Sequence, residues 1–258
     1  MHTWHWHDWQ GLPYLTCSLL KDWHHGFFTQ QFWPRSPEDL TNVLHPEASA
    51  YRLKQVHGNI VLTPQEIHSQ TSEDDSDLAA ADGLISEQPL QAVWVASADC
   101  TPVLIGDAKT GRVAALHAGW RGTAAKIVPG AIARLREQGS KLDDLRIVMG
   151  PAIAGEVYQV SVEVAAEIGA SITPHEGEQK IVDALHELPN SPLLTDPDPG
   201  KVRLDVRRVN ILQLESLGIS GEQIAIAPYC TYQTPEHFFS YRREKQKKVQ
   251  WSGIVSLS

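Results

Sequence analysis

The chain has 258 residues, and its proportions of hydrophobic residues (42%) and charged residues (21%) are those of an ordinary globular protein. A formal net charge of −9 argues against a nucleic-acid surface, which needs a basic face, but leaves room for small anions bound by local Arg and Lys. Three cysteines without close spacing argue against a disulfide framework. No apolar run is long enough for a membrane span, and residues 1–8 lack a signal-peptide pattern, so we expect a cytoplasmic protein that binds no membrane.

Residues 1–25 are rich in Trp and His, and we expect them to form an N-terminal arm. His5 and His7 alternate as in some copper sites, although a terminal aromatic segment is more often a docked arm. Residues 26–258 are then one domain, because no repeat and no composition break divides them. Its first strand is predicted at 26–29.

Two strands, at 51–56 and 59–63, are predicted on either side of a His57-Gly58 turn. Residues 64–81 are polar and acidic, which predicts a surface loop. The central block follows as a series of apolar, β-branched runs. Its strands are predicted at 92–97, 102–106 and 112–117.

Thr123 is the predicted N-cap of a helix with apolar positions up to Leu135, and Pro129 should kink this helix or mark its true start. Ser161 and Asp205 are predicted to cap two later helices. Residues 186–201 hold four prolines and are predicted to form a loop. The remaining strands are predicted at 145–149, 223–227 and 249–256. This element order predicts an α+β fold, a single mixed α/β domain whose mixed sheets have flanking helices.

Three side chains that can bind a metal lie at predicted strand ends beside glycine turns: His57, Cys100 and His117. Two imidazoles and a thiolate can hold a zinc ion with an open fourth position, which lowers the pKa of bound water to roughly 7. The alternative is that both histidines are ordinary strand-end residues and that Cys100 is a small buried hydrophobe.

Candidate substrate-binding residues lie next to these segments: Lys54, Gln55, Arg121 and Arg242. Arg and Lys side chains bind phosphate through charge-assisted hydrogen bonds. Asp99 is the candidate for proton transfer, so the candidate catalytic set is Asp99, Cys100 and His117. Asp99 has a second interpretation, in which its carboxylate orients an imidazole or a turn.

Six motifs in consistent order resemble the bacterial YfiH or laccase-domain family of purine nucleoside phosphorylases. They are Gln55-Val-His-Gly58, Ala98-Asp-Cys100, His117-Ala-Gly-Trp-Arg-Gly122, Gly150-Pro-Ala-Ile153, Cys230-Thr231 and Phe238-Phe-Ser-Tyr-Arg-Arg243. The resemblance implies a YfiH-like fold and zinc bound by His57, Cys100 and His117, with copper as the other possible metal. It also implies phosphorolysis of adenosine, inosine, guanosine and S-methyl-5′-thioadenosine, and deamination of adenosine to inosine.

Three other functions stay open from the sequence. A polyphenol oxidase fits the older name of the family but needs many more imidazoles than this site offers. A hydrolase acting on amides of cell-wall precursors would use Cys100 as nucleophile and His117 as base. A metal-binding module without turnover is the non-enzymatic possibility.

Overall fold

The computed structural model describes residues 2–70, 78–173 and 177–257, and two six-stranded sheets form its centre. The first sheet has the order β1-β2-β3-β15-β7-β4. Its strands are β1 (Trp4–Trp9), β2 (Leu12–Cys17), β3 (His25–Phe28), β15 (Gln250–Val255), β7 (Gln91–Ser97) and β4 (Ser49–Tyr51). The second sheet has the order β14-β10-β8-β9-β6-β5. Its strands are β14 (Ile224–Ile226), β10 (Leu145–Met149), β8 (Thr101–Asp107), β9 (Val113–Ala118), β6 (Gly83–Ile85) and β5 (Val61–Leu62).

The two sheets pack face to face, and the side-chain alternation of their strands divides the core into layers. In β7, Val93 and Val95 point between the sheets, whereas Trp94 packs on the outer face of the first sheet. In β8, Leu104 lies between the sheets and Ile105 faces the helices on the other side. Both faces of these central strands are therefore buried, which explains why their sequences are continuously apolar.

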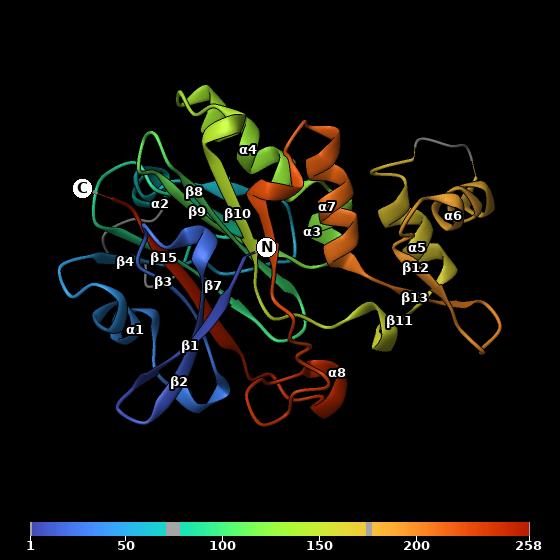
Figure 1. Ribbon diagram of the computed structural model, residues 1–258, viewed down its shortest axis with the longest axis horizontal. Helices are drawn as coiled ribbons and strands as arrows, with labels where there is room; N and C mark the ends of the chain where they lie inside the picture. Colours follow the sequence, from blue (N-terminus) through green and yellow to red (C-terminus); the bar gives the residue numbers. More distant parts are fainter. Residues whose placement is uncertain (1, 71–77, 174–176, 258) are drawn as a thin grey trace.

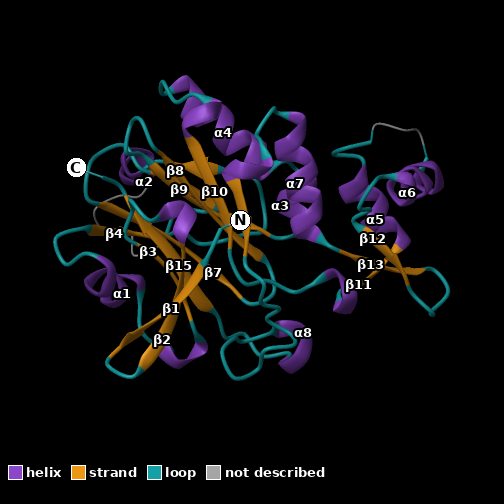
Figure 2. Cartoon of the chain, viewed as in Figure 1, coloured by secondary structure: helices purple, strands orange, loops and turns teal. Residues whose placement is uncertain are grey.

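Helices cover the two outer faces (Figures 1 and 2). They are α1 (Pro37–Leu44), α3 (Trp120–Ala124), α4 (Ile127–Glu137) and α7 (Val206–Ser216), whereas Ile67 of α2 (Pro64–Gln70) packs against the core between the sheets. Helix α1 packs against the first sheet, and α4 and α7 pack against the second. The first turn of a helix has N–H groups without partners inside the helix. Asp205 supplies an acceptor for α7, because its carboxylate accepts from the N–H groups of Arg207 and Arg208.

A small lobe stands to one side of the two sheets (Figure 1). It contains the antiparallel sheet β11-β13-β12 and the helices α5 (Val162–Gly169) and α6 (Glu178–Glu187). The strands are β11 (Gln159–Ser161), β13 (Lys201–Leu204) and β12 (Leu193–Thr195). These elements bury an apolar cluster of their own, and Trp120 of α3 packs against it. The lobe is thus attached to the main body beside the segment that carries His117.

The N-terminal residues pair within the first sheet. Strands β1 and β2 form an antiparallel hairpin, and β2 pairs with β3, so residues 4–17 are the outer strands of this sheet. Alternation places Leu15 in the core between the sheets, whereas His5 and His7 of β1 are exposed. The last helix, α8 (Tyr241–Glu244), lies at the end of a long loop before β15 (Figure 1).

Most predicted strands are confirmed, whereas the predicted start of the helix after His117 differs from the structure. Thr123 is not an N-cap: it lies within α3, and α4 begins four residues later, at Ile127. The prediction of a restart near Pro129 is close, because this proline occupies the first turn of α4, where a missing N–H costs nothing. Ser161 caps α5 as predicted.

Two predicted loops contain regular structure. Residues 64–70 form α2 instead of a loop, and an ion pair between Arg134 and Glu66 ties this helix to α4. Residues 71–77 of the same predicted loop lie outside the described residues. The proline-rich segment 186–201 includes β12, which pairs with β13. The predicted strand at 51–56 is wrong beyond Tyr51, because β4 ends there, and the predicted strand at 59–63 is shortened to β5. Asp82 accepts hydrogen bonds from the chain between them and holds it in a turn.

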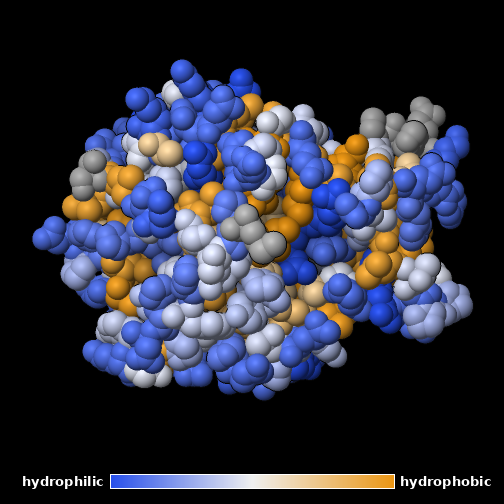
Figure 3. Space-filling model, viewed as in Figure 1, coloured by the Kyte–Doolittle hydropathy of each residue, from blue (hydrophilic) through white to orange (hydrophobic). Residues whose placement is uncertain are grey.

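Within the described residues, no helix combines the length and the apolarity needed to span a membrane. The face shown in Figure 3 carries mainly hydrophilic residues over the sheets and their covering helices.

Candidate metal centre and substrate cavity

His57, Cys100 and His117 come together from three separate segments. His117 is near the end of β9, Cys100 lies in the turn between β7 and β8, and His57 lies in the turn before β5. The antiparallel register pairs Pro102 of β8 with His117, which places the two strand ends side by side. Sheet pairing thus produces a convergence that sequence spacing cannot show.

One ligand atom from each of the three residues lies within 4.8 Å of the other two. The imidazole rings of His57 and His117 are 4.8 Å apart between centroids and tilted by 78°. Nitrogen and sulfur atoms ligate zinc at about 2.0 to 2.3 Å, so one ion between these donors fits the arrangement. Among the residues that the structure describes, no second group of three such side chains lies this close, and His5 and His7 belong to no such group.

Gly119 makes room for the thiolate. A Cβ atom at this position would lie 2.8 Å from Sγ of Cys100, closer than carbon and sulfur can approach. The Gly in the predicted His117-Ala-Gly motif is therefore required by the close packing of backbone and thiol. A side chain here would displace Cys100.

Asp82 organises both histidine segments, although no sequence motif predicted it as a site residue. Its carboxylate accepts a hydrogen bond from Nδ1 of His117 at 2.8 Å, which leaves Nε2 to face the other two ligands. It also accepts from the backbone N–H groups of Val56, His57 and Gly58, at 2.7 to 3.1 Å. His57 has a φ of 62°, a left-handed conformation that these bonds hold in place. In the sequence, Asp82 was visible only as a single acidic residue before Gly83 and the buried strand β6, a pattern that does not indicate a role in the site.

The electrostatics favour a thiolate in the site. Burial by itself would raise the pKa of Cys100, but the hydrogen bonds and charge of His117 and His57 outweigh it and lower this pKa to about 6. Burial would lower the pKa of His117, yet its hydrogen bonds with Asp82 and Cys100 raise it to about 9. Asp82 keeps a pKa below the usual value because these hydrogen bonds overcome its burial.

A cavity of about 770 Å³ opens next to these three candidate ligands. Most of the residues predicted for the site line it: Gln55, His57, Asp99, Cys100, His117, Arg121 and Arg242. Lys54 does not. Leu53 and Gln55 both line the cavity, so the side chain of Lys54 between them is exposed on the other side of the extended chain.

The two arginines of the cavity are held in different ways. The guanidinium of Arg121 lies 4.3 Å from the ring centroid of Trp120. Arg242 lies 4.8 Å from the ring centroid of Tyr158 and donates a hydrogen bond from Nη1 to the carbonyl of Gln159 at 2.8 Å. Both guanidinium groups keep donors free for an anion, because each has five N–H bonds in all.

The amide of Gln55 is already used by the fold. It donates from Nε2 to the carbonyl of Ala96 at 2.8 Å and accepts from the N–H of the same residue at 2.7 Å. This pair of bonds attaches the His57 turn to β7. The contact of Gln55 is therefore with the backbone of the cavity wall.

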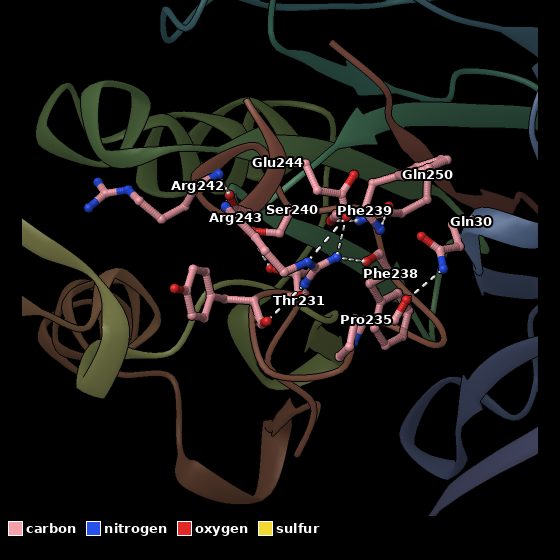
Figure 4. A network of polar contacts seen from close by, with 12 residues as sticks. Gln30, Thr231, Pro235, Phe238, Phe239, Ser240, Arg242, Arg243, Glu244 and Gln250 are labelled. Atoms are coloured by element: carbon pink, nitrogen blue, oxygen red, sulfur yellow. Dashed lines mark hydrogen bonds and ion pairs between the residues drawn. The ribbon is translucent and has the colours of Figure 1, made fainter. Parts of the chain in front are cut away.

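Asp99 connects the Cys100 turn to the loop before α8. It has a φ of 89°, and its carboxylate accepts from the hydroxyl of Thr231 and from the backbone N–H of Arg242, each at 2.7 Å. Arg243 holds the same loop against α8, because its guanidinium donates to the carbonyls of Thr231, Tyr232 and Phe238. Figure 4 shows that the side chains of Arg242 and Arg243 extend in opposite directions from α8. One faces the cavity and the other fixes the loop.

Two further parts of the cavity wall were not predicted as site residues. Tyr158 lines the cavity, and burial, with a smaller effect from the charge of Cys100, raises its pKa to about 12. The lysine-rich segment Lys245-Gln-Lys-Lys248 forms another part of the wall. A run of lysines in a sequence usually indicates a solvated surface, and only the folded chain brings this run beside the ligands.

Comparisons with known proteins agree with the sequence and the geometry. The model of a family described as multi-copper polyphenol oxidoreductase laccase matches residues 37–257. A protein from Synechocystis sp. named purine nucleoside phosphorylase is 55% identical over 256 residues, which are 98% of this chain and 97% of that protein. A protein from an unknown prokaryotic organism named adenosine deaminase is 29% identical over 66% of this chain and 60% of its own. The crystal structure of YlmD from Geobacillus stearothermophilus has the same fold, with a TM-score of 0.80, 22% identity and coverage of 98% of this chain and 99% of that one.

Proposed function

Because the chain belongs to the multi-copper polyphenol oxidoreductase laccase family, we propose from its site that it is a purine nucleoside phosphorylase. Its reaction converts a purine nucleoside and phosphate into the free base and ribose 1-phosphate. One observation carries this proposal: a single cavity holds the three potential metal ligands together with two arginines suited to an oxyanion. The name of the Synechocystis relative, 55% identical over 98% of the chain, supports the same activity.

Arg121 and Arg242 have the chemistry to hold the phosphate. In phosphorolysis a phosphate oxygen forms a bond to C1′ of the ribose while the bond from C1′ to the purine nitrogen breaks. The electron pair of the broken bond goes to the purine, which takes up a proton. Fixed guanidinium groups keep the phosphate on one side of C1′ and reduce its repulsion by other negative charges.

His57, Cys100 and His117 are the proposed metal ligands, and zinc is the proposed metal, with copper as the alternative. When bound, zinc supplies a Lewis acid and an activated water at neutral pH. The protein prepares for it in two ways. Asp82 fixes the ring of His117 with Nε2 toward the ion, and the two imidazoles keep Cys100 as a thiolate.

For Asp99 we propose the role of a positioning residue. Both carboxylate oxygens accept hydrogen bonds, one from Thr231 and one from the backbone of Arg242. These bonds favour the interpretation in which Asp99 orients a turn over the one in which it transfers a proton. The segment that it orients is the start of α8, which carries Arg242, the arginine proposed for phosphate.

Deamination of adenosine to inosine is the proposed second activity. The observation that favours it is the relative named adenosine deaminase, which matches 66% of this chain. Such a reaction needs an activated water near C6 of the purine, and the metal centre opens into the cavity in which the purine would lie. An oxidase reaction has less support, because the described residues contain one three-ligand group only.

The direct test is to incubate metal-loaded protein with adenosine and phosphate and to separate the products by chromatography. Adenine and ribose 1-phosphate are the expected products of phosphorolysis, and inosine is the expected product of deamination. Omitting phosphate should remove adenine but not inosine. Fully metal-loaded protein that forms none of these products would contradict the proposal, and a panel of the other purine nucleosides would define the preferred substrate.

A further inference from the structure

The cavity carries more positive charge than one phosphate ion requires. Five cationic side chains line it, namely Arg121, Arg242, Lys245, Lys247 and Lys248. Asp99 is the acidic residue in the same lining, and both of its oxygens already accept hydrogen bonds. This concentration of cations stands out in a chain whose net charge is −9. Arg121 and Arg242 are sufficient for one phosphate, which leaves three lysines without a role in the reaction.

Within the described part of the chain, these three lysines have no acidic partner. The ammonium of Lys245 lies 5.6 Å from the ring centroid of Tyr241, and that of Lys248 lies 5.7 Å from that of Phe239. Glu244, the acidic neighbour in sequence, is bound by the guanidinium of Arg243 at 2.6 Å. The lysine charges are therefore free to meet an anion from solvent.

The backbone directs this segment along the cavity. Helix α8 ends at Glu244, and its C-cap Lys245 has a left-handed φ of 57°, which turns the chain away from the helix axis. The chain then lines the cavity as far as Val249 before it enters β15, where Trp251 lines the cavity as well. The lysines thus form an exposed cationic rim at a wall that also contains aromatic side chains.

We propose that this rim is a second anion subsite, which binds the 5′-phosphate of a purine nucleoside monophosphate. The inference rests on the proposed function, because a purine nucleoside must occupy the cavity beside the metal centre. The 5′ carbon of the ribose carries its primary hydroxyl and projects from the ring, so a phosphate on the 5′ oxygen extends beyond the nucleoside. A cavity of about 770 Å³ has room for it, since small-molecule sites measure about 300 to 1,000 Å³.

The test compares the binding of adenosine and adenosine 5′-monophosphate to the metal-loaded protein by isothermal titration calorimetry. We expect the monophosphate to bind about tenfold more tightly at low salt, because charge-assisted hydrogen bonds from ammonium groups add to the nucleoside contacts. Added salt should reduce this advantage, since it screens exposed charges.

The variant Lys247→Gln/Lys248→Gln should lose the advantage of the monophosphate. Lys109→Gln/Lys141→Gln is the matched control, because it removes two exposed lysines that do not line the cavity. It should bind the monophosphate as the unmodified protein does. Thermal unfolding of both variants shows whether either one is misfolded.

The third ligand to be titrated is inorganic phosphate. It tests whether the lysines bind the phosphate co-substrate instead of the 5′-phosphate of a nucleotide. If the rim variant weakens inorganic phosphate and the monophosphate by the same factor, the lysines bind the phosphate co-substrate and the proposal is wrong. It is also wrong if adenosine and its monophosphate bind equally well to the unmodified protein. A failure of the proposed function is distinguishable, because it would appear as missing adenine and inosine while lysine-dependent binding of the monophosphate persists.

Discussion

The carboxylate of Asp82 accepts a hydrogen bond from Nδ1 of His117 at 2.8 Å, and both side chains are almost completely buried. This contact selects one tautomer and one ring orientation. The same carboxylate accepts from the backbone N–H groups on both sides of His57. One buried acid therefore sets the geometry of two of the three proposed ligands.

Replacing this acid should weaken metal binding. Asp82→Asn keeps the shape but removes the charge and one acceptor oxygen, so we expect metal affinity to fall about 10- to 100-fold. Competition with a chromophoric chelator measures the affinity. Asp143→Asn, at an exposed position that does not line the cavity, is the control and should leave the affinity unchanged. An unchanged affinity in Asp82→Asn would show that this contact does not orient a ligand.

Alkylation should distinguish a ligand from a nucleophile at Cys100. In metal-free protein, the pKa of about 6 makes Cys100 a thiolate at neutral pH, so its rate of reaction with iodoacetamide should rise to a plateau with a midpoint near pH 6. Zinc should protect the thiolate. Cys17 should react slowly, because it is buried and its pKa is raised by that burial.

The same experiment should also measure the turnover of metal-free protein before and after alkylation. If Cys100 is a ligand, removing the metal abolishes turnover before any alkylation. If instead metal-free protein retains turnover and alkylation of Cys100 then abolishes it, the thiolate acts as a nucleophile. That outcome would favour an amide hydrolase over the proposed phosphorylase.

Arg243 should matter for phosphate although it does not line the cavity. Arg243→Lys loses the forked donors that hold three backbone carbonyls and so loosens the loop that carries Arg242. We expect the KM for phosphate to rise about tenfold while the KM for adenosine changes much less. Arg112→Lys is the control, since Arg112 also donates to a backbone carbonyl but far from this loop. An equal rise in both KM values would indicate general damage instead of a positioning role.

His25 should make stability depend on pH. The ring accepts from the N–H of Cys17 and donates to the carbonyl of Trp23, an arrangement that needs the neutral form. Burial lowers its pKa to about 4. The unfolded chain has a pKa of about 6.5 at this residue and takes up the proton first, so acid favours unfolding.

The stabilisation is complete above about pH 6.5 and decreases by about 3 kcal/mol as the pH falls to about 4. Urea unfolding at several pH values measures this loss. His25→Gln removes the titration, so the free energy of unfolding of this variant should vary less with pH over the same interval. His186→Gln, at an exposed position, should follow the unmodified protein. Parallel pH curves for the unmodified protein and His25→Gln would contradict the assignment.

The sequence by itself determined the local elements and the candidate ligands. Continuous apolar, β-branched runs predicted the central strands correctly, because a strand buried on both faces carries apolar residues at nearly every position. Asp205 and Ser161 were identified as caps, since a cap acts on N–H groups two or three residues away. The motifs around His57, Cys100 and His117 also led correctly to the laccase-domain family.

Only the tertiary structure decided which polar side chains meet. Asp82 lies far from His117 in sequence, and strand pairing in the second sheet brings them into contact. Lys54 was predicted beside the substrate but is exposed, whereas the lysines after α8 line the cavity. The physical reason is that strand register and the path of the final loop depend on contacts between residues more than a hundred positions apart, such as Asp99 with Arg242. Local sequence patterns contain no information about such contacts.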